Sequence, residues 1–123
     1  MNIYSGIDIE DTGRFKRLYF LKPYLLQKLF QEEEWSFAIQ KPKPWETLAG
    51  IWCGKEAAVK ALNSLVKLDV HSITIKHLKD GSPFVYFSSY PSSSKPTLKL
   101  SLSISHTKTI SVATVQVLEL SAD

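Results

Sequence analysis

Hydrophobic and polar positions divide the chain into an early strand, a helical middle and a C-terminal group of strands. The early strand is predicted at residues 3–9, where isoleucines recur. Asp11 or Thr12 is a suitable N-cap for a helix that follows. From 13 to 30 the apolar residues recur at near-helical spacing, but Pro23 lacks a backbone N–H and is expected to split this segment into two helical pieces.

A long amphipathic helix is the clearest element in the pattern. It is preceded by the polar residues 31–43, which end in Lys-Pro-Lys-Pro and are predicted to be a connection without regular structure. Pro44 suits the first turn of a helix, where its missing N–H would have no partner anyway. Apolar residues then recur with a period near 3.6, which predicts a helix over about 45–66. They are Leu48, Ile51, Trp52, Ala58, Val59, Leu62, Leu65 and Val66.

The last third of the chain predicts two pairs of strands. Asp80-Gly81 is a tight-turn signal between two strand-like runs, and residues 88–96 (SSYPSSSKP) are expected to form a flexible loop before the second pair. The four predicted strands are 72–78, 83–87, 98–104 and 110–118. One strand, a helical middle and four strands indicate an α+β fold, an antiparallel sheet with one long helix packed on one face.

Size and composition fit a single domain over residues 1–123, with 44% hydrophobic and 22% charged residues. Cys53 is the only cysteine, so no internal disulfide can form, which fits a reducing cytoplasm. The N-terminus lacks the pattern of a signal peptide, and no apolar stretch approaches the roughly 20 residues that span a bilayer. We therefore expect a soluble cytoplasmic protein that does not act at a membrane.

The charge distribution is more informative than the net charge. A formal charge of +3 is too small to indicate a nucleic-acid partner. Basic residues, however, gather in one early segment, ahead of the acidic run Glu32–Glu34. Such a face suits an acidic protein or a phosphate-rich ligand, and an ordinary solvated helix face explains it equally well. The basic residues are Arg14, Lys16, Arg17, Lys22 and Lys28.

Asp8 and Glu10 stand at the end of the predicted first strand. Side chains alternate along a strand, so both carboxylates are expected on one face. Two carboxylates a few ångströms apart repel unless a proton or cation lies between them, and a hard ion such as Mg²⁺ prefers oxygen ligands. Spacing alone favours the simpler interpretation, in which they are exposed strand-end acids or a helix cap.

Lys55, Glu56 and Lys60 lie on the long predicted helix. Glu56 and Lys60 are four residues apart and share a face, which by itself indicates only a surface ion pair worth a few tenths of a kcal/mol. Lys55 projects near the middle of the apolar stripe, so it must extend out to solvent or pair with a fixed group. Small residues at Gly54 and Ala58 let either a ligand or a neighbouring element approach the helix closely.

The turn between the last two strands reads Ser103-Ile104-Ser105-His106-Thr107. Its hydroxyls and imidazole could bind phosphate or adenine groups, although a single turn histidine is more often structural. No Gly-x-Ser-x-Gly elbow or Gly-rich phosphate loop is present, and the three histidines with one cysteine lack metal-ligand spacing. The sequence therefore does not indicate a serine hydrolase, an NTPase or a zinc site.

Together these segments resemble the acyl-carrier-protein synthases, a family of phosphopantetheinyl transferases. GIDIED with Arg14-Phe15 resembles the family's opening motif, and WCGKEAAVKAL resembles its second, Lys-Glu-Ala-x-x-Lys-Ala motif. Asp80-Gly81-Ser82-Pro83 resembles the Gly-x-Pro before a strand, and SLSISHTKTISVATV resembles the Ser-Ile-Ser-His motif. The motifs occur in family order over roughly residues 3–117. Two departures are Ile51, where the family usually has arginine, and Asn63-Ser64-Leu65, where it has Gly-x-Gly.

The resemblance implies a phosphopantetheinyl transferase-like fold and a Mg²⁺-dependent transfer of the phosphopantetheine arm of coenzyme A to a carrier-protein serine. Asp8, Glu56 and Glu10 would hold the metal, and Lys60 would neutralise phosphate charge. Glu56, or a water on the metal, would accept the serine proton. The expected catalytic residues are thus Glu56, Lys60 and Asp8, and coenzyme A contacts are expected from Lys55, Lys60, Ser105, His106 and Pro83.

The resemblance also implies a homotrimer with active sites between subunits, and an acidic carrier docked on the basic helix with Arg14 and Arg17. Neither a nucleic acid nor a membrane is expected as a partner. Two alternatives stay open. The departures at Ile51 and Asn63 would suit a degenerate relative that binds carrier or nucleotide without efficient transfer. An unrelated α+β interaction module would instead carry the same acids and lysines as plain surface residues.

Overall fold

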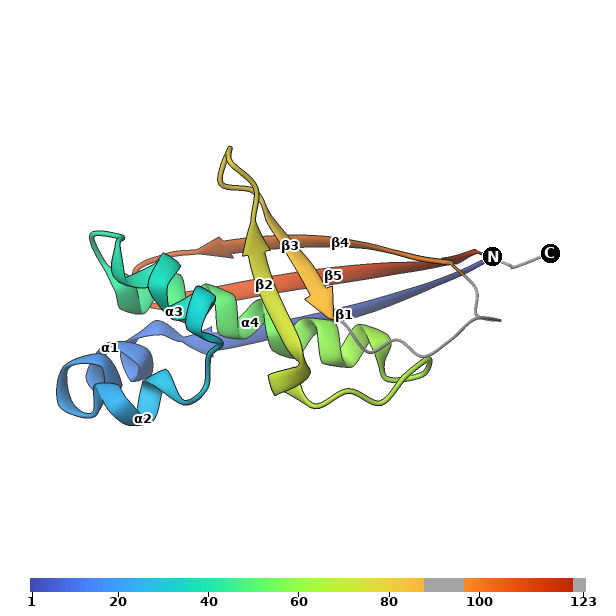
Figure 1. Ribbon diagram of the computed structural model, residues 1–123. Helices are drawn as coiled ribbons and strands as arrows, with labels where there is room; N and C mark the ends of the chain where they lie inside the picture. The colour runs from blue at the N-terminus through green and yellow to red at the C-terminus, as the bar shows by residue number, and fades with distance from the viewer. Residues whose placement is uncertain (88–96, 121–123) are drawn as a thin grey trace.

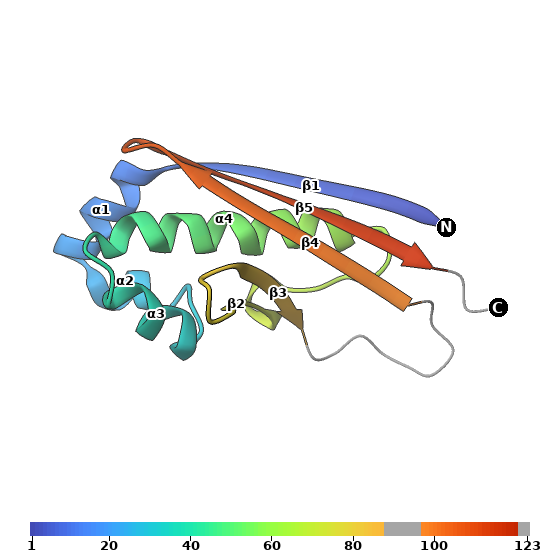
Figure 2. The same ribbon diagram turned by 90° about the horizontal axis from the view of Figure 1, so that it is seen from above.

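The computed structural model describes residues 1–87 and 97–120, so the predicted loop at 88–96 lies outside the described residues. A three-stranded antiparallel sheet lies on the long helix α4, and a separate two-stranded hairpin lies beside it (Figures 1 and 2). The strands are β1 (Asn2–Asp11), β2 (Ile73–His77), β3 (Pro83–Phe87), β4 (Thr97–His106) and β5 (Ile110–Leu120). The helices are α1 (Thr12–Leu21), α2 (Pro23–Gln27), α3 (Glu32–Ile39) and α4 (Pro44–Leu62), with a 3₁₀ turn at Val70–Ser72. The predicted α+β fold is confirmed, with the strands in two sheets.

The larger sheet has the order β1-β5-β4, which places the C-terminal strand in the centre. Its register pairs Asp8 of β1 with Ala113, and His106 of β4 with Ser111. The face toward α4 is apolar: Val115 and Val117 of β5 are fully buried there. The hairpin β2–β3 turns at Gly81, whose φ of 91° is the left-handed conformation that glycine adopts without strain.

Small residues let β1 lie very close to α4. A Cβ atom added to Gly6 would stand 2.1 Å from the Ala57 carbonyl oxygen and 2.7 Å from the Ala61 nitrogen. Ala57 and Ala61 are themselves buried on that side of the helix. This close approach sets the distance between the side chains that β1 and α4 carry.

The prediction that residues 31–43 form an irregular connection is wrong, because α3 occupies Glu32–Ile39. A capping box begins this helix: the Gln31 backbone donates to Glu34 Oε1 at 2.8 Å, and the Gln31 side chain caps the helix in return. Ala38 and the carboxylate residue Glu34 are buried, so the polar composition of the segment concealed a helix whose inner face contains an acid.

Three other element boundaries differ only slightly from the prediction. The long helix ends at Leu62 rather than near Val66, and the last two strands extend beyond their predicted limits to His106 and Leu120. Pro23 begins α2 one residue after α1 ends, so the proline does divide the early helical segment into two pieces. Over residues 1–87 and 97–120, no helix combines the length and apolar character needed to cross a membrane.

Candidate active site

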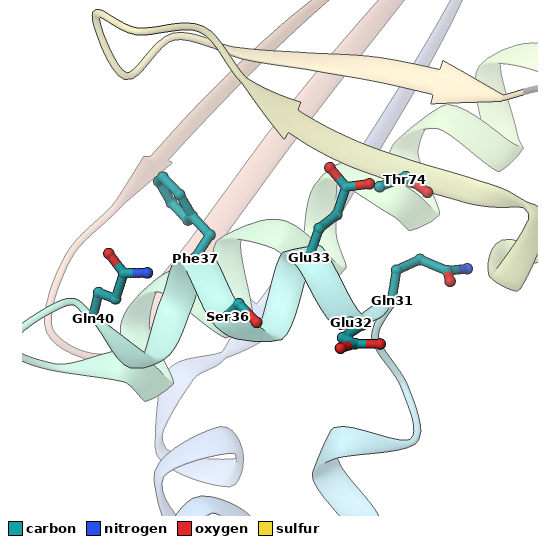
Figure 3. A pocket seen from close by; sticks show the side chains of 7 residues that line it. All are labelled: Gln31, Glu32, Glu33, Ser36, Phe37, Gln40 and Thr74. Carbon is teal, nitrogen blue, oxygen red and sulfur yellow. The ribbon is translucent and has the colours of Figure 1, made fainter.

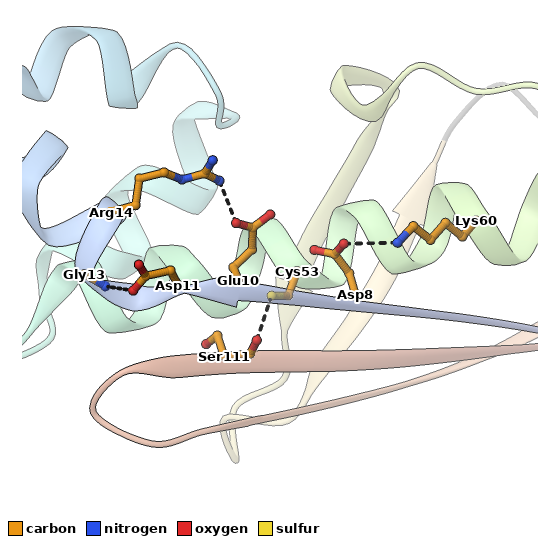
Figure 4. Close-up of polar contacts among 8 residues, drawn as sticks. All are labelled: Asp8, Glu10, Asp11, Gly13, Arg14, Cys53, Lys60 and Ser111. Atoms are coloured by element: carbon orange, nitrogen blue, oxygen red, sulfur yellow. Dashed lines mark hydrogen bonds and ion pairs between the residues drawn. The ribbon is translucent and has the colours of Figure 1, made fainter.

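A group of charged side chains lies where β1 faces α4. Asp8 and Glu10 alternate with outward-facing isoleucines on β1, and Glu56 and Lys60 lie one turn apart on α4. Figure 4 shows Asp8 and Glu10 on the same side of β1, with Lys60 reaching toward Asp8. We call Asp8, Glu10, Glu56 and Lys60 the carboxylate cluster. The predicted placement of both strand acids on one face is confirmed.

Asp8 is the most enclosed acid of this cluster, with a side chain 12% exposed. Its Oδ1 accepts from Lys60 Nζ at 3.2 Å, and the same ammonium donates to the Ile7 carbonyl at 3.0 Å. Its Oδ2 is buried and has no hydrogen-bond partner among the described residues. A buried oxygen without a partner costs free energy unless a ligand, ion or water completes the site.

The three carboxylates influence one another through space. Burial raises the pKa of Glu56 above its usual value, and the Asp8 charge raises it further, while Lys60 opposes the rise. Burial likewise raises the pKa of Glu10, against the lowering effect of Arg14 and with added repulsion from Asp8 and Glu56. Clustered acids with raised pKa values are typical of sites that bind a cation or transfer a proton.

Arg14 of α1 bonds Glu10, one of the acids of the cluster. Its Nη2 donates to Glu10 Oε1 at 2.6 Å, an i to i+4 pair that joins the end of β1 to the first turn of α1 (Figure 4). Asp11 caps that helix through the Gly13 backbone N–H at 2.9 Å. Of the two predicted caps, Asp11 is therefore the one that the structure has.

Cys53 is a neighbour of the cluster that the sequence did not indicate. Its buried thiol donates to the Ser111 carbonyl at 3.4 Å, which ties α4 to β5. Burial first, and then the negative charges of Asp8 and Glu10, raise the pKa of the Cys53 thiol to about 12. The thiol is therefore a protonated structural contact.

Metal binding by this cluster depends on how closely its side chains gather and on which of their oxygens are free. Within residues 1–87 and 97–120, no three Asp, Glu, His or Cys side chains are gathered closely enough to hold one ion. The donor chemistry nevertheless fits a hard cation, because Asp8 Oδ2 is unpartnered and all three acids offer oxygen. Joint ligation by Asp8, Glu10 and Glu56 stays a prediction.

Lys55 lies in the core, away from the carboxylate cluster. Both it and Glu34 are 0% exposed at the side chain, and Lys55 Nζ donates to Glu34 Oε1 at 2.7 Å. The sequence left open whether Lys55 extends to solvent or pairs with a fixed group, and the structure shows that it pairs with Glu34. The prediction that Lys55 contacts coenzyme A is not supported, because its ammonium is enclosed and already paired.

His106 and Pro83, two of the predicted coenzyme A contacts, line one cavity of about 270 Å³. The cavity lies between α3, the first half of α4, the β2–β3 hairpin and the end of β4, and we call it the hairpin cavity. Ile51 and Ile104 line it together with the ring of Phe37. Ser105, also predicted to contact coenzyme A, is exposed and does not line this cavity.

The hairpin cavity and the carboxylate cluster lie on opposite sides of α4. Thr47, which lines the cavity, and Glu56 are nine residues apart, and at about 100° per residue they point in opposite directions. A single chain therefore does not bring His106 and Asp8 to the same side of the helix.

The basic face predicted on the early helices is exposed. Arg14, Lys16 and Arg17 of α1 are all accessible, as are Lys22 and Lys28 around α2. Phe20, Leu21 and Tyr24 stand among them with 61%, 76% and 63% exposure. Cationic and large apolar groups thus share one end of the molecule, opposite the two termini (Figure 1).

A second, larger hollow contains none of the predicted site residues. It is an open groove of about 670 Å³ between α3 and β2. Figure 3 shows Glu32 and Glu33 on this helix, with Glu33 and Phe37 pointing toward the hairpin. Glu33 pairs with Lys76 at 3.7 Å, and both glutamates of the groove are exposed to solvent.

Comparison with known proteins gives a consistent result. The model of the 4'-phosphopantetheinyl transferase superfamily matches residues 5–115. A holo-[acyl-carrier-protein] synthase of Caldanaerobacter subterraneus is 32% identical over 111 residues, covering 87% of each chain. One of Chloroherpeton thalassium is 34% identical over 113 residues, covering 89% of this chain and 93% of the relative.

Solved structures extend the similarity to the fold. The holo-(acyl-carrier-protein) synthase of Bacillus anthracis, solved in complex with CoA (3',5'-ADP), has a TM-score of 0.74 and 27% identity, with 96% of each chain covered. The Helicobacter pylori enzyme in complex with coenzyme A has a TM-score of 0.72 and 26% identity, covering 93% of this chain and 99% of the other. By its motifs, its fold and these full-length similarities, the chain belongs to the 4'-phosphopantetheinyl transferase superfamily.

Proposed function

We propose that this protein is a holo-[acyl-carrier-protein] synthase, which transfers the 4'-phosphopantetheine arm of coenzyme A to a serine of an apo carrier protein. The observation that carries the proposal is the carboxylate cluster, with a buried unpartnered Asp8 oxygen beside the acid–base pair Glu56 and Lys60. The relatives described above are named holo-[acyl-carrier-protein] synthases, and this chain matches 87% and 93% of their lengths.

Asp8 and Glu56, with Glu10, would hold the Mg²⁺ ion that this chemistry uses. When bound, the ion neutralises the diphosphate of coenzyme A and makes the β-phosphorus easier to attack. Glu10 already accepts a hydrogen bond from Arg14, so Asp8 and Glu56 are its main protein ligands in our proposal. The raised pKa values of Glu10 and Glu56 support a site that gains from a positive charge.

The reaction exchanges one phosphorus–oxygen bond for another. The serine oxygen attacks the β-phosphorus, and the bond from that phosphorus to the bridging oxygen breaks, which releases adenosine 3',5'-bisphosphate. Glu56, which lies beside Asp8 in the cluster, would accept the serine proton. Lys60, whose side chain is 55% exposed, turns from Asp8 to the phosphates and stabilises the charge on the leaving group.

His106 and Pro83 would bind the nucleotide end of coenzyme A in the hairpin cavity. His106 is about half exposed at the side chain, with its Nδ1 4.0 Å from Glu46 Oε1. Ser105 points away from α4, on the outer face of the sheet. It could meet a nucleotide only from a neighbouring protomer.

We further propose a homotrimer with its active sites between protomers. The carboxylate cluster and the hairpin cavity lie on different sides of α4, and a coenzyme A molecule bound between two chains could use the cluster of one and the cavity of the other. The outer face of β1 supports this, because Ile3, Ile7 and Ile9 are 69%, 59% and 64% exposed in alternating positions. Phe84 and Tyr86 on β3 add exposed apolar surface. A sedimentation profile with only a 13.9 kDa species at micromolar concentration would reject the trimer.

The carrier would dock on the basic end formed by α1 and α2. Arg14 stands between this surface and the carboxylate cluster, because it bonds Glu10 while remaining 54% exposed at the side chain. Arg17 and Lys28 offer further positive charge, and Phe20 with Tyr24 offers apolar contact. An acidic helix of a carrier could therefore be held close to Asp8.

Intact-mass measurement of a carrier tests the proposal. The protein is incubated with coenzyme A, Mg²⁺ and an apo acyl carrier protein, and the carrier should gain one phosphopantetheine. The matched control is a carrier with alanine at the acceptor serine, which should gain nothing. Carrier or nucleotide binding without any mass gain would instead favour the degenerate relative, for which Ile51 in the place of the family's arginine is the motivating departure.

A further inference from the structure

The hairpin cavity has a flat aromatic wall that none of the motifs includes. The ring of His77, the last residue of β2, lies against the ring of Phe37 on α3. Their centroids are 3.7 Å apart and their planes differ by 8°, which is a parallel stack. Both residues line the cavity, and Phe37 points from α3 toward the hairpin (Figure 3).

Three features fix this stack in place. Phe37 comes from a helix that the buried Glu34 anchors to α4 and β2. Lys41 Nζ lies 4.5 Å from the centroid of the Phe37 ring and holds it through a cation–π contact. Burial, and then the nearby Lys41 charge, lower the pKa of His77, so its ring is neutral near pH 7.

The remaining lining of the cavity suits a planar base that bears phosphates. Part of its lining is apolar, with Ile51 and Ile104, and Ile104 packs so closely on Gly50 that a Cβ atom there would be 3.0 Å from it. Lys41 supplies positive charge and His106 an imidazole, and Glu46 is the one carboxylate among the lining residues. Its Oε1 faces His106 Nδ1 at 4.0 Å.

We propose that His77, supported by Phe37, is the stacking surface for the adenine ring of coenzyme A. The inference rests on the proposed function, because the nucleotide is that of the proposed donor. Stacking of a base on an aromatic side chain is sequence-tolerant because every base has a π-face. His77 is then a residue that selects the nucleotide end of the substrate and takes no part in the transfer step.

Calorimetric titration with adenosine 3',5'-bisphosphate tests this on the full-length protein. His77→Ala should raise the Kd about tenfold, which corresponds to about 1.4 kcal/mol. His77→Phe keeps a flat ring and should stay within about threefold of the wild type. His71→Ala is the matched control, because His71 is exposed and lies outside the cavity; it should leave the Kd unchanged. Circular dichroism should show that each variant is folded.

A second probe separates base stacking from general damage. Pantetheine 4'-phosphate lacks the base, so its affinity should be the same for wild type and His77→Ala. The proposal is overturned if His77→Ala binds the bisphosphate as wild type does, or if His77→Phe loses as much affinity as His77→Ala.

The outcome is independent of the transfer assay. If the bisphosphate binds in a His77-dependent manner but no carrier is modified, the proposed function fails and the stacking surface stands. If carriers are modified normally by His77→Ala at low coenzyme A concentration, the stacking surface fails and the function stands.

Discussion

Lys55 and Glu56 are neighbouring charged residues of α4, but their side chains lie in different environments. Lys55 turns into the core, where it and Glu34 are both 0% exposed. Glu34 Oε1 accepts from Lys55 Nζ at 2.7 Å and from the Gln31 backbone, and Oε2 accepts from the Ile75 backbone at 2.7 Å. Glu56, the next residue, turns to the carboxylate cluster, where Asp8 Oδ2 has no partner among the described residues.

The difference separates a structural role from a binding role. A buried charge pair with every oxygen occupied fixes α3, α4 and β2 relative to one another and leaves no capacity for a ligand. Clustered acids with raised pKa values and an oxygen without a partner can instead bind a cation. Helical spacing already separated Lys55, in the apolar stripe, from Glu56 and Lys60, whereas the family resemblance assigned all three to the active site.

The largest effect is expected from Lys55→Met. Removal of one partner leaves Glu34 charged and buried, which should lower the free energy of unfolding by about 3–5 kcal/mol. Urea denaturation followed by circular dichroism measures it. The double variant Lys55→Met with Glu34→Gln should recover part of the loss, since no uncompensated charge remains. If Lys55→Met is as stable as the wild type, the ion pair is not the structural anchor described here.

Glu56→Gln should act on transfer and spare the fold. Loss of a metal ligand and proton acceptor should reduce kcat by about 10²–10³-fold, the range seen when one stabilising group is removed from an active site. Stability should not fall, because the change removes a negative charge near Asp8. Asp8→Asn should behave in the same way. The control is Glu33→Gln, an exposed acid paired with Lys76, and it should transfer at the wild-type rate.

Gly6→Ala should disturb both regions through the spacing of β1 and α4. The added Cβ would meet the Ala57 carbonyl at 2.1 Å, so the strand must move away from the helix. We expect a loss of about 1–3 kcal/mol in stability, the usual range for overpacking, together with slower transfer because Asp8 moves away from Glu56. Gly13→Ala, where the nearest atom is the Asp11 side chain at 3.1 Å, is the milder control. Equal melting temperatures for Gly6→Ala and wild type would contradict the close approach.

Arg17→Glu should give the smallest effect, confined to the carrier. Arg17 is exposed on the basic end and does not bond Glu10, whereas Arg14 does, so it reports docking without altering the cluster. A repulsive rim charge should raise KM for the carrier about tenfold, or about 1.4 kcal/mol, and the effect should shrink at high salt. KM for coenzyme A should barely change. A change in KM for coenzyme A alone would mean that this helix contacts the nucleotide. Lys79→Glu on the hairpin is the charge-matched control.

Local patterns in the sequence predicted most of the elements, because periodicity and turn residues act within a few positions. The long helix, the division at Pro23 and both strand pairs were recognised in this way. The helix α3 was missed because the burial of its inner face depends on a long-range contact, although its capping box of Gln31 and Glu34 is local. Three consecutive glutamates look fully solvated, and Glu34 can be buried only because Lys55, 21 residues later, neutralises it.

The site was predicted in part, for a related reason. The strand period places Asp8 and Glu10 on one face, and the helix period places Glu56 and Lys60 together. The close approach of that strand to the helix, however, depends on the packing of Gly6 against Ala57. The place of His106 on the far side of α4 depends on the sheet order β1-β5-β4, which no local pattern specifies. The stack of Phe37 on His77 joins two segments 40 residues apart and had no sequence signal.

Dependence of the transfer on a divalent cation tests the central claim most directly. Apo carrier protein and coenzyme A are incubated with the wild type in excess chelator and again with Mg²⁺ restored, and the carrier is weighed intact. Our account predicts one phosphopantetheine on the carrier only when Mg²⁺ is present, with Asp8→Asn inactive in both conditions. Undiminished modification in chelator, or modification by Asp8→Asn at the wild-type rate, would contradict the assignment of the carboxylate cluster as the catalytic cation site.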